Sequence, residues 1–226
     1  MHRDLYRRAA FQLLITPFYF GALLFLPAGT FDYWEAWVFI VVFFVATVCL
    51  TVWLAVKDPE LLERRMRAGP RAEQATSQKI IVTIAFICFI GVTVLPALDH
   101  RFGWSRVPRA VVVIGNALVA LSFLGYFFVF RENTYGGATI RVEEGQKVIS
   151  TGPYRIVRHP MYTAGLLMFT AIPLALGSWW GLLFALVGLA ALAWRIREEE
   201  RLLARELPGY ADYMHSVRWR MIPGIY

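Results

Sequence analysis

The chain has 226 residues, of which 58% are hydrophobic, and a formal net charge of +7. A soluble domain of this length needs fewer hydrophobic residues to fill one core, so the composition excludes an ordinary soluble protein and indicates a membrane protein. The positive charge does not indicate a nucleic-acid partner, because the basic residues gather in segments that flank apolar stretches, as the loops of membrane proteins do.

Four apolar segments are long enough to cross the ~30 Å hydrocarbon core of a bilayer as helices. The first is too long for the apolar part of a signal peptide and lacks a small-residue cleavage site, so we expect it in the mature protein. Cys49 and Cys88 fall inside the predicted spans, which argues against a disulfide framework and a thiolate metal site, and no metal is predicted. The spans lie at about 11–28, 33–56, 80–98 and 108–130.

A further apolar stretch, 160–194, is interrupted by Pro173 and by "GSWWG" at 177–181. These interruptions predict a hairpin of two shorter helices rather than one long rod. The expected fold class is therefore all-α, a polytopic membrane helical bundle with four spans and a C-terminal helical hairpin, five to six membrane helices in total. The chain then divides into N-terminal membrane helices and a C-terminal region made of a connection, the hairpin and a tail helix: 1–130, and 131–226 with the parts 131–159, 160–194 and 195–226.

The basic residues predict an orientation. If the N-terminus is cytoplasmic, 20 of the 23 Lys and Arg residues lie on the cytoplasmic side, and only Arg101, Arg106 and Arg109 lie outside. The positive-inside rule then places both termini in the cytoplasm. The predicted spans carry no ionisable residue near their middle, which argues against an ion transporter or proton pump. Short loops and the excess of Arg over Lys, 20 to 3, favour a bacterial inner membrane.

Polar residues concentrate in the two segments that flank the hairpin, the connection 131–159 and the tail after residue 195. An antiparallel hairpin returns the chain to the side it left. We therefore expect His159 to approach the three carboxylates at 198–200 near the membrane surface.

The start of the hairpin is a candidate anion site. Pro160 suits the first position of a helix, where its missing N–H costs nothing. The free N–H groups of Met161, Tyr162 and Thr163 would then face a pocket, with Arg155 and Arg158 adding positive charge. An ordinary turn with interfacial aromatic and basic anchors is the alternative interpretation.

The tail offers acidic groups. Glu198, Glu199 and Glu200 are consecutive, and Arg195 lies four residues before Glu199, so a solvated helix with i,i+4 ion pairs is one interpretation. Three carboxylates beside the membrane are also suitable partners for a ligand that carries positive charge or hydrogen-bond donors.

The segment "GPYRIVRHPMYTAG", the hairpin, "RIREEERLLARELPGYADY" and a terminal "IP" together resemble the isoprenylcysteine carboxyl methyltransferase and phospholipid methyltransferase superfamily. The resemblance covers about 131–223. It implies a small integral membrane enzyme that uses S-adenosyl-L-methionine as cofactor, in a pocket at the cytoplasmic mouth of the last helices. It also implies that the following residues contact the cofactor or shape its approach: Gly152, Pro153, Tyr154, His159, Pro160, Met161, Tyr162, Glu199, Glu200 and Leu203.

In the tail, the resemblance implies matching positions at Tyr210, Tyr213 and one of Arg218 or Arg220, because the spacing in "VRWRMIP" allows either arginine. Tyr213, Arg218 and Arg220 are the candidates for contacting the substrate. Arg131 and Asn133 end the fourth span and are candidates for positioning the head of the acceptor. The catalytic residue stays open, since alignment of acceptor and methyl group is the main catalytic requirement. If the acceptor is an amine, Glu199, Glu200 and His159 are the candidate bases.

The expected function is transfer of a methyl group to a hydrophobic, lipid or prenylated acceptor within the bilayer. A soluble Rossmann-type methyltransferase is excluded because no G-x-G-x-x-G follows a strand. A phospholipid N-methyltransferase, an NADPH-dependent relative of sterol reductases and a non-catalytic scaffold remain alternatives, and the acceptor atom (O, N or S) and oligomeric state stay open. The first two spans, including Phe18, Tyr19 and Phe20, are expected either to line the acceptor's path or simply to face lipid.

Overall fold

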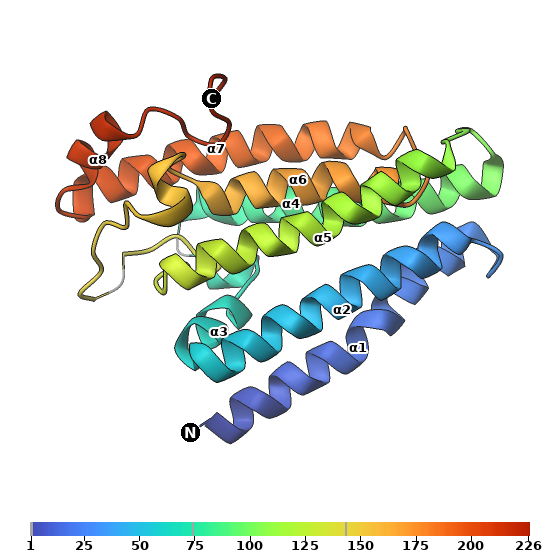
Figure 1. The fold of residues 1–226 in the computed structure, drawn as a ribbon, viewed down its shortest axis with the longest axis horizontal. Helices are drawn as coiled ribbons and strands as arrows, with labels where there is room; N and C mark the ends of the chain where they lie inside the picture. Colours follow the sequence, from blue (N-terminus) through green and yellow to red (C-terminus); the bar gives the residue numbers. More distant parts are fainter. Residues whose placement is uncertain (1, 74, 143) are drawn as a thin grey trace.

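The computed structural model describes residues 2–73, 75–142 and 144–226. Within these ranges the protein contains eight α-helices, two short 3-10 helices and no strand (Figure 1). The α-helices are α1 (His2–Ala28), α2 (Trp34–Lys57), α3 (Pro59–Met66), α4 (Thr76–Phe102), α5 (Arg109–Glu132), α6 (Pro160–Ala175), α7 (Leu182–Glu206) and α8 (Tyr210–Ser216), and the 3-10 helices are η1 (Pro70–Ala72) and η2 (Gly152–Arg155).

Helices α1, α2, α4 and α5 are long and apolar enough to cross a membrane, and α6 is a shorter apolar helix. The predicted all-α fold with four spans and a C-terminal hairpin is therefore confirmed. Helix α6 ends at Ala175, and Gly177, with φ of +72°, reverses the chain toward α7. Pro173 lies inside the last turn of α6 and does not break it. Helix α7 continues past residue 194 to Glu206, so it contains the second helix of the hairpin and the first part of the tail.

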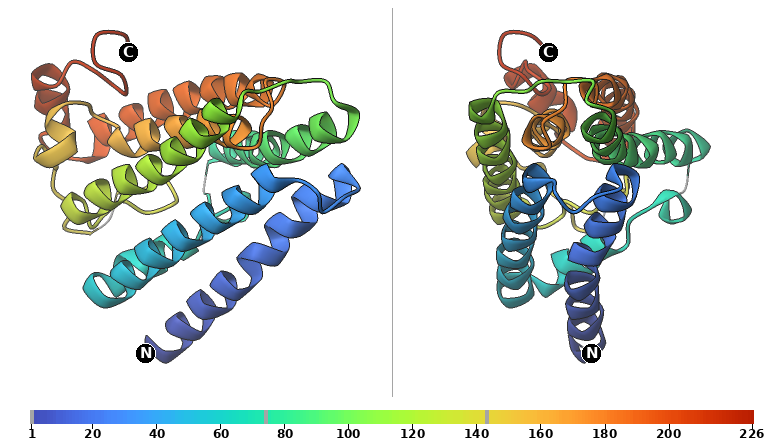
Figure 2. Two further views of the ribbon diagram at one scale, coloured as in Figure 1. Left: turned by 45° about the vertical axis from the view of Figure 1, so that its right-hand side comes forward. Right: turned by 90° about the vertical axis from the view of Figure 1, so that its right-hand side faces the viewer.

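The helices form two layers. Helix α1 packs against α4 and α2 against α5, while α6 lies beside α5 and α7 beside α4. Figure 2 shows α1 and α2 on one side of the group α4–α7. One exposed stripe of α2 is entirely apolar, with side chains more than half exposed at helical spacing, and such a stripe suits contact with lipid tails: Val41, Val45, Val52 and Val56.

Small residues let α5 and α6 approach closely. A Cβ atom added to Gly115 would lie 2.3 Å from the backbone N of Ala175, and one added to Gly125 would lie 3.2 Å from the Cβ of Ala164. Close approach through small residues is a usual way for membrane helices to associate. It fixes α6, and with it the polar residues at the start of α6, against the end of α5.

A buried carboxylate ties two loops together at the opposite end of the bundle. Asp99 accepts hydrogen bonds from the backbone N and the Oγ of Ser105, both 2.6 Å long, and from the Oγ of Ser178. The Tyr33 hydroxyl, which precedes α2, donates to the carbonyl of Leu176 over 2.7 Å. The α1–α2, α4–α5 and α6–α7 connections are thereby held at one common end.

We expect Gly115→Ala to destabilise the protein, because the new methyl group would collide with the backbone of α6. Overpacking of this kind costs about 1–3 kcal/mol. Thermal unfolding in detergent measures the loss. Gly21→Ala is the matched control, since a Cβ there meets no atom within 4 Å, and equal unfolding temperatures for the two variants would contradict the expectation.

Candidate functional site

A polar pocket lies where the α5–α6 connection, the start of α6, the end of α7 and α8 meet. It is narrow, with a volume of about 90 Å³, and residues between Asn133 and Ile149 line one side of it. Many of the residues predicted from the sequence line this polar pocket: Asn133, Tyr154, His159, Met161, Tyr162, Glu199, Leu203 and Tyr213.

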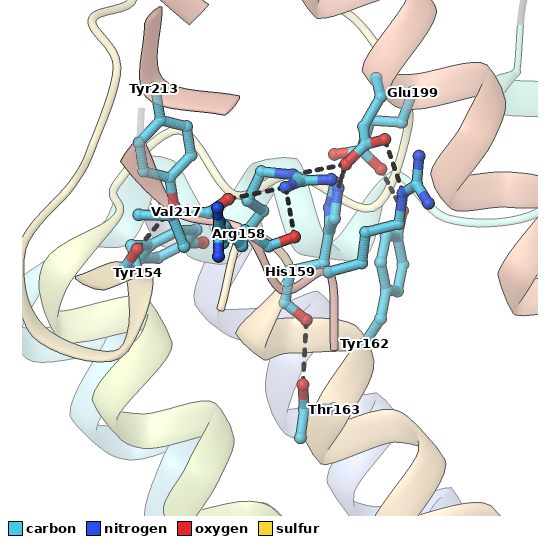
Figure 3. A network of polar contacts seen from close by, with 11 residues as sticks. Tyr154, Arg158, His159, Tyr162, Thr163, Glu199, Tyr213 and Val217 are labelled. Carbon is cyan, nitrogen blue, oxygen red and sulfur yellow. Dashed lines mark hydrogen bonds and ion pairs between the residues drawn. The ribbon is translucent and has the colours of Figure 1, made fainter. Parts of the chain in front are cut away.

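Glu200 is the centre of a buried ionic cluster beside the polar pocket, and Figure 3 labels two members of this cluster, Arg158 and His159. The Arg158 Nε donates to its Oε1 over 2.7 Å, and the Arg220 Nε donates to its Oε2 over 2.8 Å. The His159 Nε2 lies 3.2 Å from Glu200 Oε1. The predicted approach of His159 to the carboxylates is confirmed, and the cluster joins the start of α6, the end of α7 and the C-terminal tail.

The cluster keeps Glu200 ionised. Burial alone disfavours a charged carboxylate, but the hydrogen bonds from His159, Arg158 and Arg220 outweigh it and lower the pKa of Glu200 to about 2. The guanidinium of Arg158 also donates through Nη1 to the carbonyls of Val217, over 2.6 Å, and Arg218, over 2.9 Å. The tail is thus bound by both side-chain and backbone groups.

Glu199 points in a different direction from Glu200 and lines the polar pocket. It accepts a hydrogen bond from the Tyr162 hydroxyl. The Arg195 Nε donates to that same hydroxyl over 2.9 Å, so the three side chains form a chain from α6 to α7 (Figure 3).

The interpretation of Arg195 as part of a solvated helix face is wrong. Its side chain is buried and donates to Gln78 Oε1 and Glu73 Oε1, each over 2.9 Å. These partners come from the start of α4 and the segment before it, so local spacing along α7 could not identify them.

The expected anion site at the helix start is largely wrong as well. The N–H groups of Tyr162 and Thr163 donate to the carbonyl of His159, over 3.0 and 3.1 Å, and are not free. The preceding backbone is also engaged, because the N–H groups of Arg158 and His159 donate to Trp219 and Arg220 carbonyls over 2.9 and 2.8 Å. The start of α6 is therefore held by its own turn and by the tail.

Tyrosines form the other wall of the polar pocket. The Asn133 Nδ2 donates to the Tyr154 hydroxyl over 2.8 Å, and the Tyr213 hydroxyl donates to the Tyr154 carbonyl over 2.7 Å. The Tyr210 hydroxyl is buried and has no hydrogen-bond partner among the described residues. Burial and the nearby Glu199 and Glu200 raise the pKa of Tyr210, so this hydroxyl stays protonated.

Other predicted residues lie near the polar pocket but do not line it: Gly152, Pro153, Pro160, Glu200, Arg131, Arg218 and Arg220. Gly152 has φ of +54°, and a Cβ there would lie 2.5 Å from the Cγ of Glu132, so this glycine allows the turn before α6. Arg131 lies over the Phe128 ring, 5.2 Å from its centre. Of the two tail arginines, Arg220 reaches Glu200 with its side chain, whereas Arg218 contributes its carbonyl.

Several residues that line the polar pocket were not among the site residues expected from the sequence, for example Arg195, Tyr135 and Leu207. A sequence signal existed for one of them. Arg195, Glu199 and Leu203 follow each other at intervals of four and so share one face of α7. That face points into the polar pocket.

We expect Glu200→Gln to lose about 3–5 kcal/mol of folding free energy, because Arg158 then stays buried without its counter-charge. Unfolding in detergent measures the loss. Glu198→Gln is the matched control, since Glu198 pairs with Arg201, whose side chain is 72% exposed, and such pairs contribute about 0–1 kcal/mol. Similar losses in both variants would contradict a structural role for the cluster.

The cluster also predicts a pH dependence. The pKa of Glu200 falls from its ordinary value of 4.5 to about 2 on folding. A lowered pKa contributes stability that is fully present above the unfolded value and is lost as the pH falls through the folded value. Unfolding curves between about pH 5 and 2 should therefore show a steeper loss for the wild type than for Glu200→Gln, and parallel curves would contradict the assignment.

Comparison with known proteins identifies the region that builds the polar pocket. No curated protein matches the chain. Residues 110–208 match the family model of phospholipid methyltransferase, a match that implies methyltransferase activity. The matched segment contains α6, α7 and nearly all of α5. Through this segment the chain matches the phospholipid methyltransferase family, consistent with the superfamily of membrane methyltransferases that its sequence motifs resemble.

Proposed function

We propose that the protein is an integral membrane S-adenosylmethionine-dependent methyltransferase that acts on a hydrophobic or lipid-linked acceptor and binds its cofactor in the polar pocket. One observation carries the proposal: the family match, residues 110–208, covers most of the residues that line this pocket, although not those of α8. We further propose that the polar pocket faces the cytoplasm of a bacterial cell. The ends of the helices around it carry most of the basic residues, and arginine outnumbers lysine 20 to 3.

The residues of the polar pocket fit the chemistry of this cofactor. Glu199 offers a carboxylate to ribose hydroxyls or an amino group, and His159 and Arg195 lie on the same wall. The partnerless Tyr210 hydroxyl is a buried donor and acceptor that a ligand would satisfy.

S-adenosylmethionine supplies an electrophilic methyl group, so the main task of the protein is to align the acceptor with it and to exclude water. The Glu200 cluster performs part of this task by fixing His159 and the start of α6. With a pKa of about 2, Glu200 is too weak a base to take a proton from an amine. Glu199 and His159 remain the candidate bases for an amine acceptor, while a carboxylate acceptor needs none.

The first test is isothermal titration of the detergent-purified protein with S-adenosylmethionine, S-adenosylhomocysteine and NADPH. Saturable binding of the two adenosyl ligands is the expected result. Binding of NADPH alone, or of none of the three, would overturn the proposed function.

Two tyrosine variants test whether the cofactor binds in the polar pocket. Tyr210→Phe should weaken S-adenosylmethionine binding by roughly three- to tenfold, the effect of one hydrogen bond, without lowering stability, because no described residue bonds to the lost hydroxyl. Tyr226→Phe is the control, since its hydroxyl is also buried without a partner but lies outside the polar pocket. Equal affinity in both variants would place the cofactor elsewhere.

A further inference from the structure

A second, larger cavity lies between the two helical layers. It has a volume of about 630 Å³ and is lined mostly by apolar side chains of α1, α2, α4 and α5, among them Leu13, Phe43, Leu54 and Phe123. Figure 1 shows α1 and α2 diverging from the other helices toward α3, and this apolar cavity lies in that region. Tyr19 and Phe20, expected from the sequence near an acceptor path, line it, whereas Phe18 faces a different groove.

One basic side chain, Arg65 of α3, lines the apolar cavity. The side chain of Asp58 caps α3 by accepting the Leu61 N–H over 2.9 Å, which fixes this short helix beneath α2. The guanidinium carbon of Arg65 lies 5.0 Å from the centre of the Phe130 ring, in cation–π contact.

Arg65 stands in the wall between the apolar cavity and the polar pocket. Its Nη1 donates to the carbonyl of Gly137 over 3.0 Å and contacts the sulfur of Met161 at 3.3 Å. Gly137 and Met161 both line the polar pocket. The guanidinium is therefore adjacent to the place where we propose that the methyl group is transferred.

Arg65 has no counter-ion in the described part of the chain. The neighbouring arginines each have a counter-ion: Arg64 pairs with Glu60 at 3.7 Å, and Arg67 pairs with Glu63 at 2.8 Å. Both contacts of Arg65 use Nη1, so the described residues leave its Nε and Nη2 without a hydrogen-bond acceptor. A guanidinium edge with two such donors matches the two oxygens of a carboxylate or a phosphate.

We propose that Arg65 binds the anionic group of an amphiphile whose apolar chain occupies the apolar cavity. The residue thereby selects acceptors that carry a carboxylate or phosphate next to a long apolar chain. That this amphiphile is the methyl acceptor rests on the proposed function, but binding itself does not, because Arg65 and the cavity are present without the cofactor.

The test measures binding in a neutral detergent without S-adenosylmethionine. A fluorescent C16 carboxylate is displaced by palmitate, hexadecyl phosphate or palmitamide, which share the chain and differ in the head group. The wild type should bind at least one of the two anions about tenfold or more tightly than the amide. The stronger of the two anions then identifies carboxylate or phosphate as the group that Arg65 prefers.

Substitutions of Arg65 and Arg67 test whether Arg65 is the residue responsible for the preference for anionic ligands. Arg65→Met should reduce the affinity for the preferred anion to that of the amide, Arg65→Lys should retain part of the preference, and Arg67→Gln should retain all of it. Equal wild-type affinity for all three ligands, or a preference that persists in Arg65→Met, would overturn the inference. If Arg65→Met does not fold, the wild-type comparison and Arg65→Lys still decide it. Failure of cofactor titration alone would overturn the proposed function and leave anion selection standing.

Discussion

The geometry of the polar pocket depends on the buried charge of Glu200. Arg158 and His159 from the start of α6 and Arg220 from the tail meet on this one carboxylate of α7, so the cluster joins three segments. Each of these charges would be costly to bury alone, and together they offset one another. The start of α6, the end of α7 and the tail must therefore be in place at the same time, which makes the pocket a product of tertiary structure and not of any single helix.

The neighbouring residues Glu199 and Glu200 of α7 have different roles. Successive residues on a helix point about 100° apart, so when Glu200 turns into the ionic cluster, Glu199 turns toward Tyr162 and the polar pocket. The ion pairs of Glu200 fix the orientation of α7 about its own axis. This orientation determines the direction in which Glu199 points. Of two identical side chains, Glu200 thus holds the structure together and Glu199 faces the polar pocket.

Local patterns in the sequence predicted the spans, the hairpin and the approach of His159 to the tail, because apolar length and the reversal at Gly177 are local properties. They did not predict that Arg195 is buried, since its partners come from residues 73 and 78, far from α7 in the sequence. The helix start at Pro160 also looked more open than it is. Its donors are taken by the carbonyl of His159 and by a tail more than fifty residues away, which no local rule reveals.

The bonds of Asp99 and Tyr33 fix one end of both helical layers, while the layers separate toward α3. Any further parting of α1 and α2 from the rest is then a rotation about the fixed end. Such a rotation leaves distances within the group α4–α7 unchanged. The cost of admitting a bulky chain therefore falls on the contacts of α1 with α4 and of α2 with α5, and not on the Glu200 cluster.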